Sequence, residues 1–443
     1  MRYNKHNTQP IAPEHAMPTA ASPLFSPLRI GTLELPGRLF KTATAETRAT
    51  ADGFVTDAVL DFYRPMAHAG TPLIITGNIY ISRQAKSAPW QLGADHDDKI
   101  PGLARLTGLV HSHGSKMFAQ LNHCGRQIVP DYVGATEVVS ASAVKDLLTG
   151  TRPREMRIEE IRRIIDDFAD AAERCQRAGF DGVQMHSANG YLLSQFLTPY
   201  TNRRSDDYGG SLEERTRFGR EVFRAIRARV GPDFPVIIKM NGADWLPLRN
   251  GLKTPELVRV AEIMQNEGVD AVEISVGHYE SGFPMVCGTF DRCLRNMLDG
   301  SMGALPTPRR QLLRLFRPLI ALASNWLWPG RQGFNLDYTP DFKARLKIPV
   351  ICVGGFRTRD AMEAALAAGQ CDAVSAGRAF IADPYLYAHL RDNVTGPRCV
   401  DCNACVGHLG SQPADCYHPA IRAEKDAMLA RIEAGATQHA SNP

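Results

Sequence analysis

The sequence predicts an α/β protein built as a (β/α)8 barrel, and three observations carry this prediction. Short apolar runs alternate with amphipathic segments from residue 39 onward, eight such runs can be counted, and polar or glycine residues follow the runs where they end. Alternating strands and helices favour a parallel sheet. A barrel of eight such units needs about 250 residues, so the 443 residues of this chain leave room for extensions and an insertion.

Eight short apolar runs are the expected strands. In chain order they are Leu39–Ala43, Leu73–Thr76, Met117–Leu121, Gly182–Met185, Val236–Met240, Ala271–Ser275, Val350–Val353 and Ala373–Ala376. The segments between them carry helix signals. Ile161–Ala172 places its apolar residues on one helical face, and Ser211 with Glu214 forms a capping-box pair. Thr254 stands as a cap residue before the first-turn Pro255.

Composition divides the chain into a barrel and three additions. Residues 1–22 lack the apolar core of a secretory signal and predict a flexible leader on a cytoplasmic protein. Residues 23–395 are the expected barrel, followed by a Cys-rich segment at 396–420 and a C-terminal tail at 421–443.

The barrel is interrupted by residues 287–332, between the sixth and seventh strands. We expect this insert to form an excursion over the barrel mouth that serves as a substrate lid or a packing element. Because basic and aromatic residues flank its apolar body, a helix lying in a membrane interface is the alternative. Pro318 in the middle of the run argues against a continuous helix.

The composition excludes several classes of protein. Apolar residues at 44% and charged residues at 22% are ordinary values for a globular protein with a sizeable core. The net charge of +4 is spread without long basic runs, so the sequence does not indicate a surface that binds nucleic acid. No stretch reaches eighteen uninterrupted apolar residues, so a transmembrane helix is not expected.

The strongest chemical signal lies at the end of the fourth expected strand. There His186, Asn189 and Tyr191 place three hydrogen-bond donors within six residues, and Gly190 allows a tight turn between them. Each residue alone has a structural explanation, since a His at a strand end is usually a satisfied core residue and Asn-Gly is a turn signal. Together they favour a site where a carbonyl oxygen fits between His186 and Asn189.

Other strand ends carry residues suited to binding a phosphorylated ligand. The seventh and eighth strands end in Gly354-Gly355 and Gly377-Arg378, and exposed backbone N–H groups in such turns can approach a phosphate closely. Lys239 ends the fifth strand, which leaves open a Schiff-base lysine and an aldolase-type lyase. Glu273, Ser275 and His278 near the end of the sixth strand receive no role.

The residues from His186 to Phe218 closely resemble the fingerprint of the old yellow enzyme family. Support comes from three further stretches, Gln120–Arg126, Pro349–Arg357 and Ser375–Pro384, and the resemblance covers about Pro23 to Asn393. Members of this family are flavin reductases on a (β/α)8 barrel that bind FMN without a covalent link. The resemblance therefore implies FMN as cofactor and NADH or NADPH as reductant.

The resemblance also implies a role for each matching position. The residues expected to bind FMN are Ala43, Thr44, Gly77, Gln120, Lys239, Gly354, Gly355, Gly377 and Arg378. Lys239 stands where many members have arginine. It offers a positive charge to the flavin pyrimidine but cannot form the bidentate hydrogen bonds of a guanidinium group. His186 and Asn189 would hold the carbonyl of an α,β-unsaturated substrate, and Tyr191 would deliver the proton. The partner is then a small enone-type molecule, and both dimers and higher homo-oligomers occur in such families.

Four of the ten cysteines, Cys399, Cys402, Cys405 and Cys416, lie within eighteen residues. This segment resembles a subgroup that includes the dienoyl-CoA reductases and trimethylamine dehydrogenase, which hold a four-iron cluster at this position. The resemblance implies a [4Fe–4S] cluster, with zinc or free thiols as alternatives. The other six cysteines are expected to be unpaired core thiols.

Two functions besides an ene-reductase stay open at this point. Because the chain ends at Pro443, we expect the appended domains of that subgroup to be absent, so a cluster would serve an external partner. The chain would then act as an electron-transfer or amine-dehydrogenase-type flavoprotein subunit. The aldolase reading of Lys239 is the other alternative.

Overall fold

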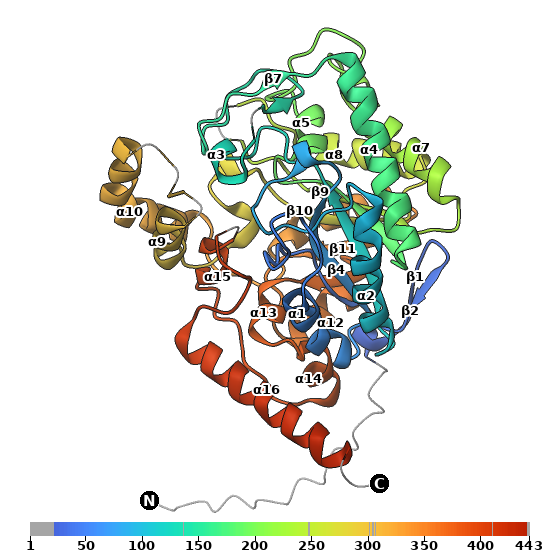
Figure 1. Cartoon of the computed structure of the whole chain (residues 1–443), viewed down its shortest axis with the longest axis vertical. Coiled ribbons are helices and arrows are strands. Elements are labelled where there is room, and N and C mark those ends of the chain that lie inside the picture. Colours follow the sequence, from blue (N-terminus) through green and yellow to red (C-terminus); the bar gives the residue numbers. More distant parts are fainter. Residues whose placement is uncertain are drawn as a thin grey trace, which may run out of the picture.

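Figure 1 shows the computed structural model of the protein. The structure describes residues 22–440 except 136, 247, 248, 301, 304, 306 and 410. The expected leader, residues 1–22, therefore lies outside the described residues apart from Ser22.

Eight parallel strands close into a barrel in the order β10-β11-β12-β3-β4-β5-β8-β9, which confirms the predicted fold class. The strands are β3 (Leu39–Lys41), β4 (Leu73–Tyr80), β5 (Lys116–Asn122), β8 (Gly182–Ser187), β9 (Val236–Asn241), β10 (Ala271–Ser275), β11 (Val350–Val353) and β12 (Ala373–Ala376). Each expected run forms one strand. The first ends earlier than predicted, at Lys41, because the following residues leave the sheet and line a cavity.

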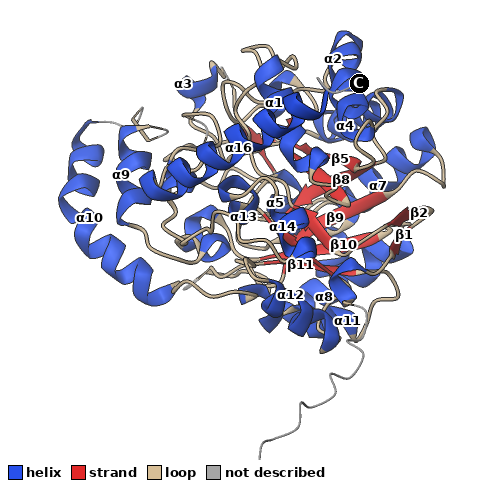
Figure 2. Ribbon diagram, turned by 90° about the horizontal axis from the view of Figure 1, so that it is seen from below, coloured by secondary structure: helices blue, strands red, loops and turns tan. Residues whose placement is uncertain are grey.

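Helices follow the strands and surround the barrel, as Figure 2 shows. The longer ones are α1 (Asp57–His68), α2 (Ile100–His111), α4 (Ile158–Arg177), α7 (Arg217–Val230), α8 (Thr254–Asn266), α12 (Arg359–Ala367) and α14 (Leu386–Asp392). The shorter ones are α3 (Pro130–Val133), α5 (Leu192–Leu197), α6 (Leu212–Arg215), α11 (Thr339–Lys343), α13 (Arg378–Ala382) and α15 (Ala404–Gly407). A parallel pair, β6 (Val139–Ser140) and β7 (Arg154–Glu155), precedes α4.

The helix signals in the sequence are confirmed in two cases and shifted in one. The predicted apolar face of α4 is buried, and Ser211 caps α6 in a capping box with Glu214. Thr254 is the first residue of α8 rather than its cap. The cap is Lys253, whose backbone N–H donates to Glu256 Oε2 at 3.0 Å. The helix thus begins where the Glu256 side chain can reach back to the cap residue.

An antiparallel hairpin closes the amino-terminal end of the barrel. Its strands are β1 (Leu28–Ile30) and β2 (Leu33–Leu35), and the buried Ile30 and Leu35 belong to one apolar cluster with inward residues of the barrel strands, such as Phe40 and Phe118. Because this end is filled, the cavities of the barrel lie at its carboxyl end, where binding sites of such barrels are found.

The insert between β10 and β11 forms two helices, α9 (Asp291–Asp299) and α10 (Thr307–Leu327). Helix α10 continues through Pro318, so the expectation that this proline interrupts the helix is wrong. In Figures 1 and 2 both helices lie at the outer edge of the molecule, beside the barrel. No helix among the described residues is long and apolar enough to cross a membrane.

The C-terminal segment ends in a long helix, α16 (Pro419–Ala440), which accounts for most of the expected tail. In Figure 1 it runs along the lower edge of the molecule. The Cys-rich residues before it contact the barrel, because the Arg48 side chain donates to the Ala414 carbonyl at 3.0 Å and the Ala414 N–H donates to the Glu46 carbonyl at 2.9 Å.

Candidate active site

An open cavity lies at the carboxyl end of the barrel, with about 1090 Å³ of empty space when its open mouth is included. Eleven of the twelve residues predicted to bind cofactor or substrate line it: Ala43, Thr44, Gln120, His186, Asn189, Tyr191, Lys239, Gly354, Gly355, Gly377 and Arg378. The exception is Gly77, which lies behind Glu46, since a Cβ at Gly77 would stand 1.8 Å from Glu46 Oε2. The structure therefore brings the sequence-predicted residues into one site.

One end of this cavity is built to bind an anion. Gly355 has a φ of +68°, and a Cβ there would stand 2.5 Å from the Arg331 carbonyl, so a glycine is required. Arg357 and Arg378 lie beside the glycine turns, and both form ion pairs with Asp401 of the Cys-rich segment. Asp401 itself has a positive φ of 51° and lines the same cavity. Its carboxylate thus neutralises the two cations that a phosphate would bind.

Under the cavity, a buried polar network runs across four strands. Gln120 Nε2 donates to Gln184 Oε1 at 2.7 Å, and Gln184 Nε2 donates to Glu273 Oε2 at 3.0 Å. Lys239 Nζ lies 3.3 Å from Glu273 Oε2 and donates to Thr42 Oγ1 at 3.1 Å. Glu273, which had no role in the sequence analysis, is therefore the anion that holds Lys239. Gln120 therefore has its amide oxygen and the second hydrogen of Nε2 left to offer a ligand.

The Glu273 carboxylate is the ionised acid at the centre of this network. Burial opposes ionisation of Glu273, but the Lys239 charge and hydrogen bonds from Ser375, Thr42 and Gln184 outweigh it and keep the pKa of Glu273 below its usual value. Lys239 is thus one half of a buried ion pair. An ammonium group held in this way has no lone pair for attack on a carbonyl, which weakens the Schiff-base alternative.

His186 presents one defined donor to the cavity. Its Nδ1 accepts a hydrogen bond from the Ala188 backbone N–H at 3.4 Å, which leaves the proton of the neutral ring on Nε2. Burial, followed by the charge of Lys239, lowers the pKa of His186 well below 6.5. The ring is therefore a neutral imidazole at physiological pH, with Nε2–H as its donor.

Asn189 is held by the end of β10. Its Nδ2 donates to Ser275 Oγ at 3.2 Å and to the Val276 carbonyl at 3.0 Å, and its φ of 57° makes the turn after β8 left-handed. Of the predicted pair, the donor free to reach a ligand is thus His186. Asn189 fixes the turn in this arrangement, and its amide must rotate before it can donate into the cavity.

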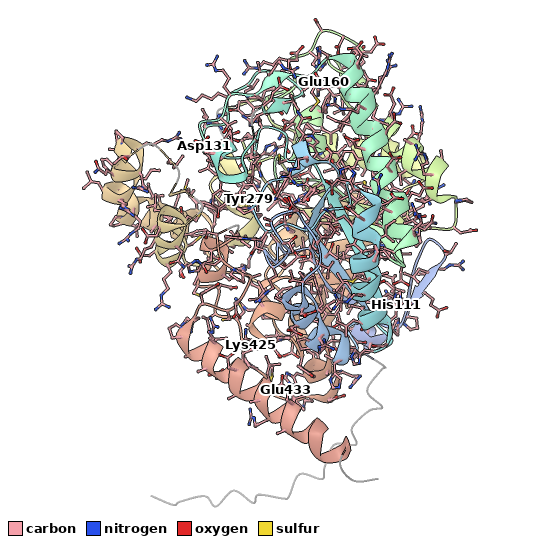
Figure 3. All side chains as sticks on the ribbon, in the orientation of Figure 1. His111, Asp131, Glu160, Tyr279, Lys425 and Glu433 are labelled. Carbon is pink, nitrogen blue, oxygen red and sulfur yellow. The ribbon has the colours of Figure 1, made fainter. Side chains whose placement is uncertain are left out.

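Tyr191 is a phenol that keeps its proton. Burial and the neighbouring Tyr279 raise the pKa of Tyr191 well above its usual value of 10. Its ring centroid lies 4.5 Å from that of His186 and 6.0 Å from that of Tyr279. Figure 3 labels Tyr279 on the side of the barrel toward α3 and α9. The two phenols are hydrogen-bonded to each other, which gives Tyr191 a protic neighbour.

A second cavity of about 1150 Å³ adjoins the first. The two share Ala45, Asn78, Tyr191, Tyr279, Val406 and Leu409. The insert lines the second cavity through Met297 of α9 and through Met302 and Leu305 beyond it. Part of the insert therefore forms one wall of this cavity. The sequence analysis missed Tyr279 and Asn78, and for Tyr279 the available signal was its position just after β10.

Lys41, which is fully buried beneath the site, makes folding stability depend on pH. Burial lowers its pKa from 10.5 to about 7. Between these values the unfolded chain holds a proton that the folded chain does not, so the contribution of Lys41 to stability rises with pH from about 7 to 10. We expect the parent to gain stability relative to a Lys41→Met variant over this range, measured by urea unfolding at several pH values. A constant difference between the two proteins would contradict the assignment.

The four clustered cysteines lie next to the anion-binding end. All four line one cavity of about 310 Å³, together with Arg378, Tyr417 and His418. As the side chains stand, the described residues contain no group of three or more His, Cys, Asp or Glu that could hold a metal ion. Burial raises the pKa of the Cys405 thiol to about 12. The other six cysteines are buried and unpaired, as predicted.

Comparison with known proteins identifies relatives along most of the chain. The chain is 34% identical over 388 residues to an NADH oxidase of Thermoanaerobacter brockii, which covers 87% of the chain and 53% of the relative. It is 29% identical over 439 residues to a cinnamate reductase of Clostridium sporogenes, covering 93% of the chain and 59% of the relative. The chain thus spans little more than half the length of these curated relatives.

Solved structures agree with the barrel. A 2-naphthoyl-CoA reductase in complex with 2-naphthoyl-CoA superposes with a TM-score of 0.76 at 25% sequence identity, covering 91% of the chain and 58% of that structure. The model of the NADH:flavin oxidoreductase / NADH oxidase family matches residues 23–284, from the start of the barrel through β10. The match covers more than half of the chain and includes the His186–Tyr191 turn. The chain therefore belongs to the NADH:flavin oxidoreductase / NADH oxidase family, a family of flavin-dependent oxidoreductases.

Proposed function

We propose that this protein is an FMN-dependent, NAD(P)H-oxidising ene-reductase that reduces the C=C bond of α,β-unsaturated carbonyl compounds. The observation that carries the proposal is the geometry of one cavity. It combines an anion-binding end with a neutral imidazole donor and a protonated phenol. Arg357, Arg378 and the glycine turns suit the phosphate of FMN, and Gln120 with Lys239 suits the polar edge of the flavin ring.

The substrate chemistry follows from the protonation states of His186 and Tyr191. When bound, FMN would supply the chemistry of hydride transfer to the β-carbon of the enone, with NADH or NADPH as the reductant. As negative charge grows on the carbonyl oxygen, His186 Nε2–H stabilises it, with Asn189 as second donor once its amide has turned. Tyr191 then protonates the α-carbon. Tyr279 passes a proton to Tyr191 through their hydrogen bond and regains one from solvent.

The reaction class can be tested directly. FMN-loaded protein should consume NADPH or NADH in proportion to added 2-cyclohexenone, and the product should be the saturated ketone with its carbonyl intact. If the protein instead oxidises a secondary or tertiary amine and leaves the enone unreacted, the amine-dehydrogenase alternative is favoured. Product analysis by mass spectrometry separates the two outcomes.

Asp401 provides a test of the phosphate site. The FMN phosphate must compete with this carboxylate for Arg357 and Arg378, so Asp401→Asn is expected to tighten FMN binding about tenfold. Quenching of FMN fluorescence on titration with apoprotein measures the affinity. Asp392→Asn, which removes a charge from an exposed pair with Arg391, is the matched control. Weaker FMN binding by the Asp401 variant would show that Asp401 holds the arginines in place instead.

We propose further that Cys399, Cys402, Cys405 and Cys416 bind a [4Fe–4S] cluster. Their common cavity supports this, since three thiolates from one loop and a later one can reach the corners of a cubane after their side chains turn inward. The cavity shares Arg378, Ile381, Cys399 and Cys405 with the flavin cavity, so the cluster would lie at the phosphate end.

Unpaired thiols throughout the described chain suit a reducing compartment, such as the cytoplasm.

Anaerobic purification should yield about four iron atoms and four sulfides per chain. Cys402→Ser is expected to lower the iron content well below one atom per chain while FMN affinity changes by less than about threefold, because the flavin cavity does not contain Cys402. Cys371→Ser, at a buried thiol outside the segment, should leave the iron content unchanged. One zinc atom per chain without iron would contradict the cluster and support the zinc alternative.

A further inference from the structure

Helix α10 carries a continuous apolar surface that nothing in the described chain covers. Twelve large hydrophobic side chains are exposed in the described residues, and seven of them lie on this helix: Leu312, Leu315, Phe316, Leu319, Leu322, Trp326 and Leu327. Leu315 is 73% and Trp326 80% exposed. Figures 1 and 2 both place α10 at the outer edge of the molecule. Such a patch on a soluble protein marks an interaction surface.

The spacing of these residues indicates a helical partner. Leu312, Leu315, Leu319, Leu322 and Trp326 follow one another at intervals of three, four, three and four residues, which is the a/d pattern of a coiled-coil seam. The opposite face is already used, since Ala321 is buried with Phe290 and Leu294 of the α9 region. One side of α10 thus holds it to its own chain, and the other side presents a seam.

We propose that α10 pairs with α10 of a second copy of this chain and forms a homodimer. The five seam side chains, together with Phe316 beside them, offer roughly 750 Å² of exposed surface, close to the approximately 800 Å² that each partner buries in a standard stable interface. A second copy necessarily brings the same helix, and two identical seams close on each other around a two-fold axis. A second copy of the chain therefore offers a surface of the same size and the same apolar character as the one it would cover.

Charge favours this partner over an anionic membrane. The helix has four arginines and no acidic residue, but its arginines are committed to their own chain. Arg314 pairs with Asp299 at 2.6 Å and Arg317 with Asp291 at 3.3 Å, and Arg310 donates to the Gly303 carbonyl at 2.7 Å. The positions that flank the seam, including Gln311, Phe316 and Ala323, carry no charge. No like charges therefore face each other across the seam when two copies pair. An anionic membrane would have to compete for these arginines with their partners in the chain.

The test is the mass of the full chain in solution, by sedimentation velocity over a range of concentrations. We expect a dimer of twice 48.7 kDa. The double variant Leu315→Glu, Leu322→Glu should raise the dissociation constant at least roughly a hundredfold, since it puts charges in the centre of the seam. Leu327→Glu makes the same change on the same helix outside the a/d positions and should leave the dimer intact. Because both seam positions are exposed, FMN affinity should be unchanged, which checks folding.

Two results would overturn the proposal. The first is a parent chain that stays monomeric at every concentration up to the micromolar range. If such a monomer sediments with vesicles of anionic phospholipid, the seam is a membrane-binding surface instead. The second is a dimer that the double variant leaves unchanged, which would place the interface elsewhere.

Discussion

Replacing Tyr191 with Phe is expected to slow reduction of an enone by 10²- to 10⁴-fold, the range that a positioned general acid contributes. The phenol is buried, keeps its proton at physiological pH and adjoins the imidazole that receives the carbonyl. The substitution removes a single oxygen and preserves the ring. Oxidation of NADPH, which requires no proton from Tyr191, should stay within a few-fold of the parent. Stopped-flow absorbance under anaerobic conditions measures the two half-reactions separately.

Tyr279→Phe provides the matched control for this prediction. It removes the same atom from the phenol that lies beside Tyr191 and lines the same two cavities. We expect a loss of less than about tenfold, since Tyr191 can still donate and is only reprotonated more slowly. If both variants lose activity equally, the proton donor cannot be assigned to Tyr191. If Tyr191→Phe retains the parent rate, protonation occurs from solvent and the proposed role is wrong.

Replacing Lys239 with Met is expected to destabilise the fold by about 3–5 kcal/mol, because it leaves the Glu273 carboxylate buried without its cation. FMN affinity should also fall, since the substitution removes the cation closest to the polar network under the cavity. Urea unfolding of the apoproteins and fluorescence titration with FMN measure the two effects.

The double variant Lys239→Met, Glu273→Gln separates the cost of an unpaired charge from the loss of Lys239 itself. Removing both charges should restore most of the stability, although not the FMN affinity. A single variant as stable as the parent would show that the pair contributes nothing. Trapping of a carbonyl substrate on Lys239 by borohydride in flavin-free protein would instead revive the aldolase alternative.

The sequence predicted the barrel because its signals are local. A buried parallel strand must be apolar along its length, so each of the eight runs was visible without knowledge of its neighbours. The site residues followed because they stand where those strands end. What stayed hidden were pairings between distant strands. Glu273 had no role until the barrel placed β9 beside β10 and brought Lys239 within 3.3 Å.

Two other positions show the same limit of local signals. The packing of Gly77 against the flavin stays a prediction, and the sequence did not reveal that the Glu46 side chain lies beside this glycine. Pro318 was taken to interrupt a helix, yet α10 passes through it, because a proline on an exposed face costs one hydrogen bond without preventing the packing of the opposite face. The 3-4-3-4 spacing of the seam was present in the sequence, but only the exposure of these residues shows that they are not core.

The most direct test of the central claim is a visible absorption spectrum of the purified protein, recorded anaerobically and again after NADPH and then an enone are added. The proposed function predicts a flavin band that bleaches with NADPH and returns with the enone, and the cluster adds a broad shoulder with matching iron. A colourless protein that takes up no FMN on reconstitution would contradict it.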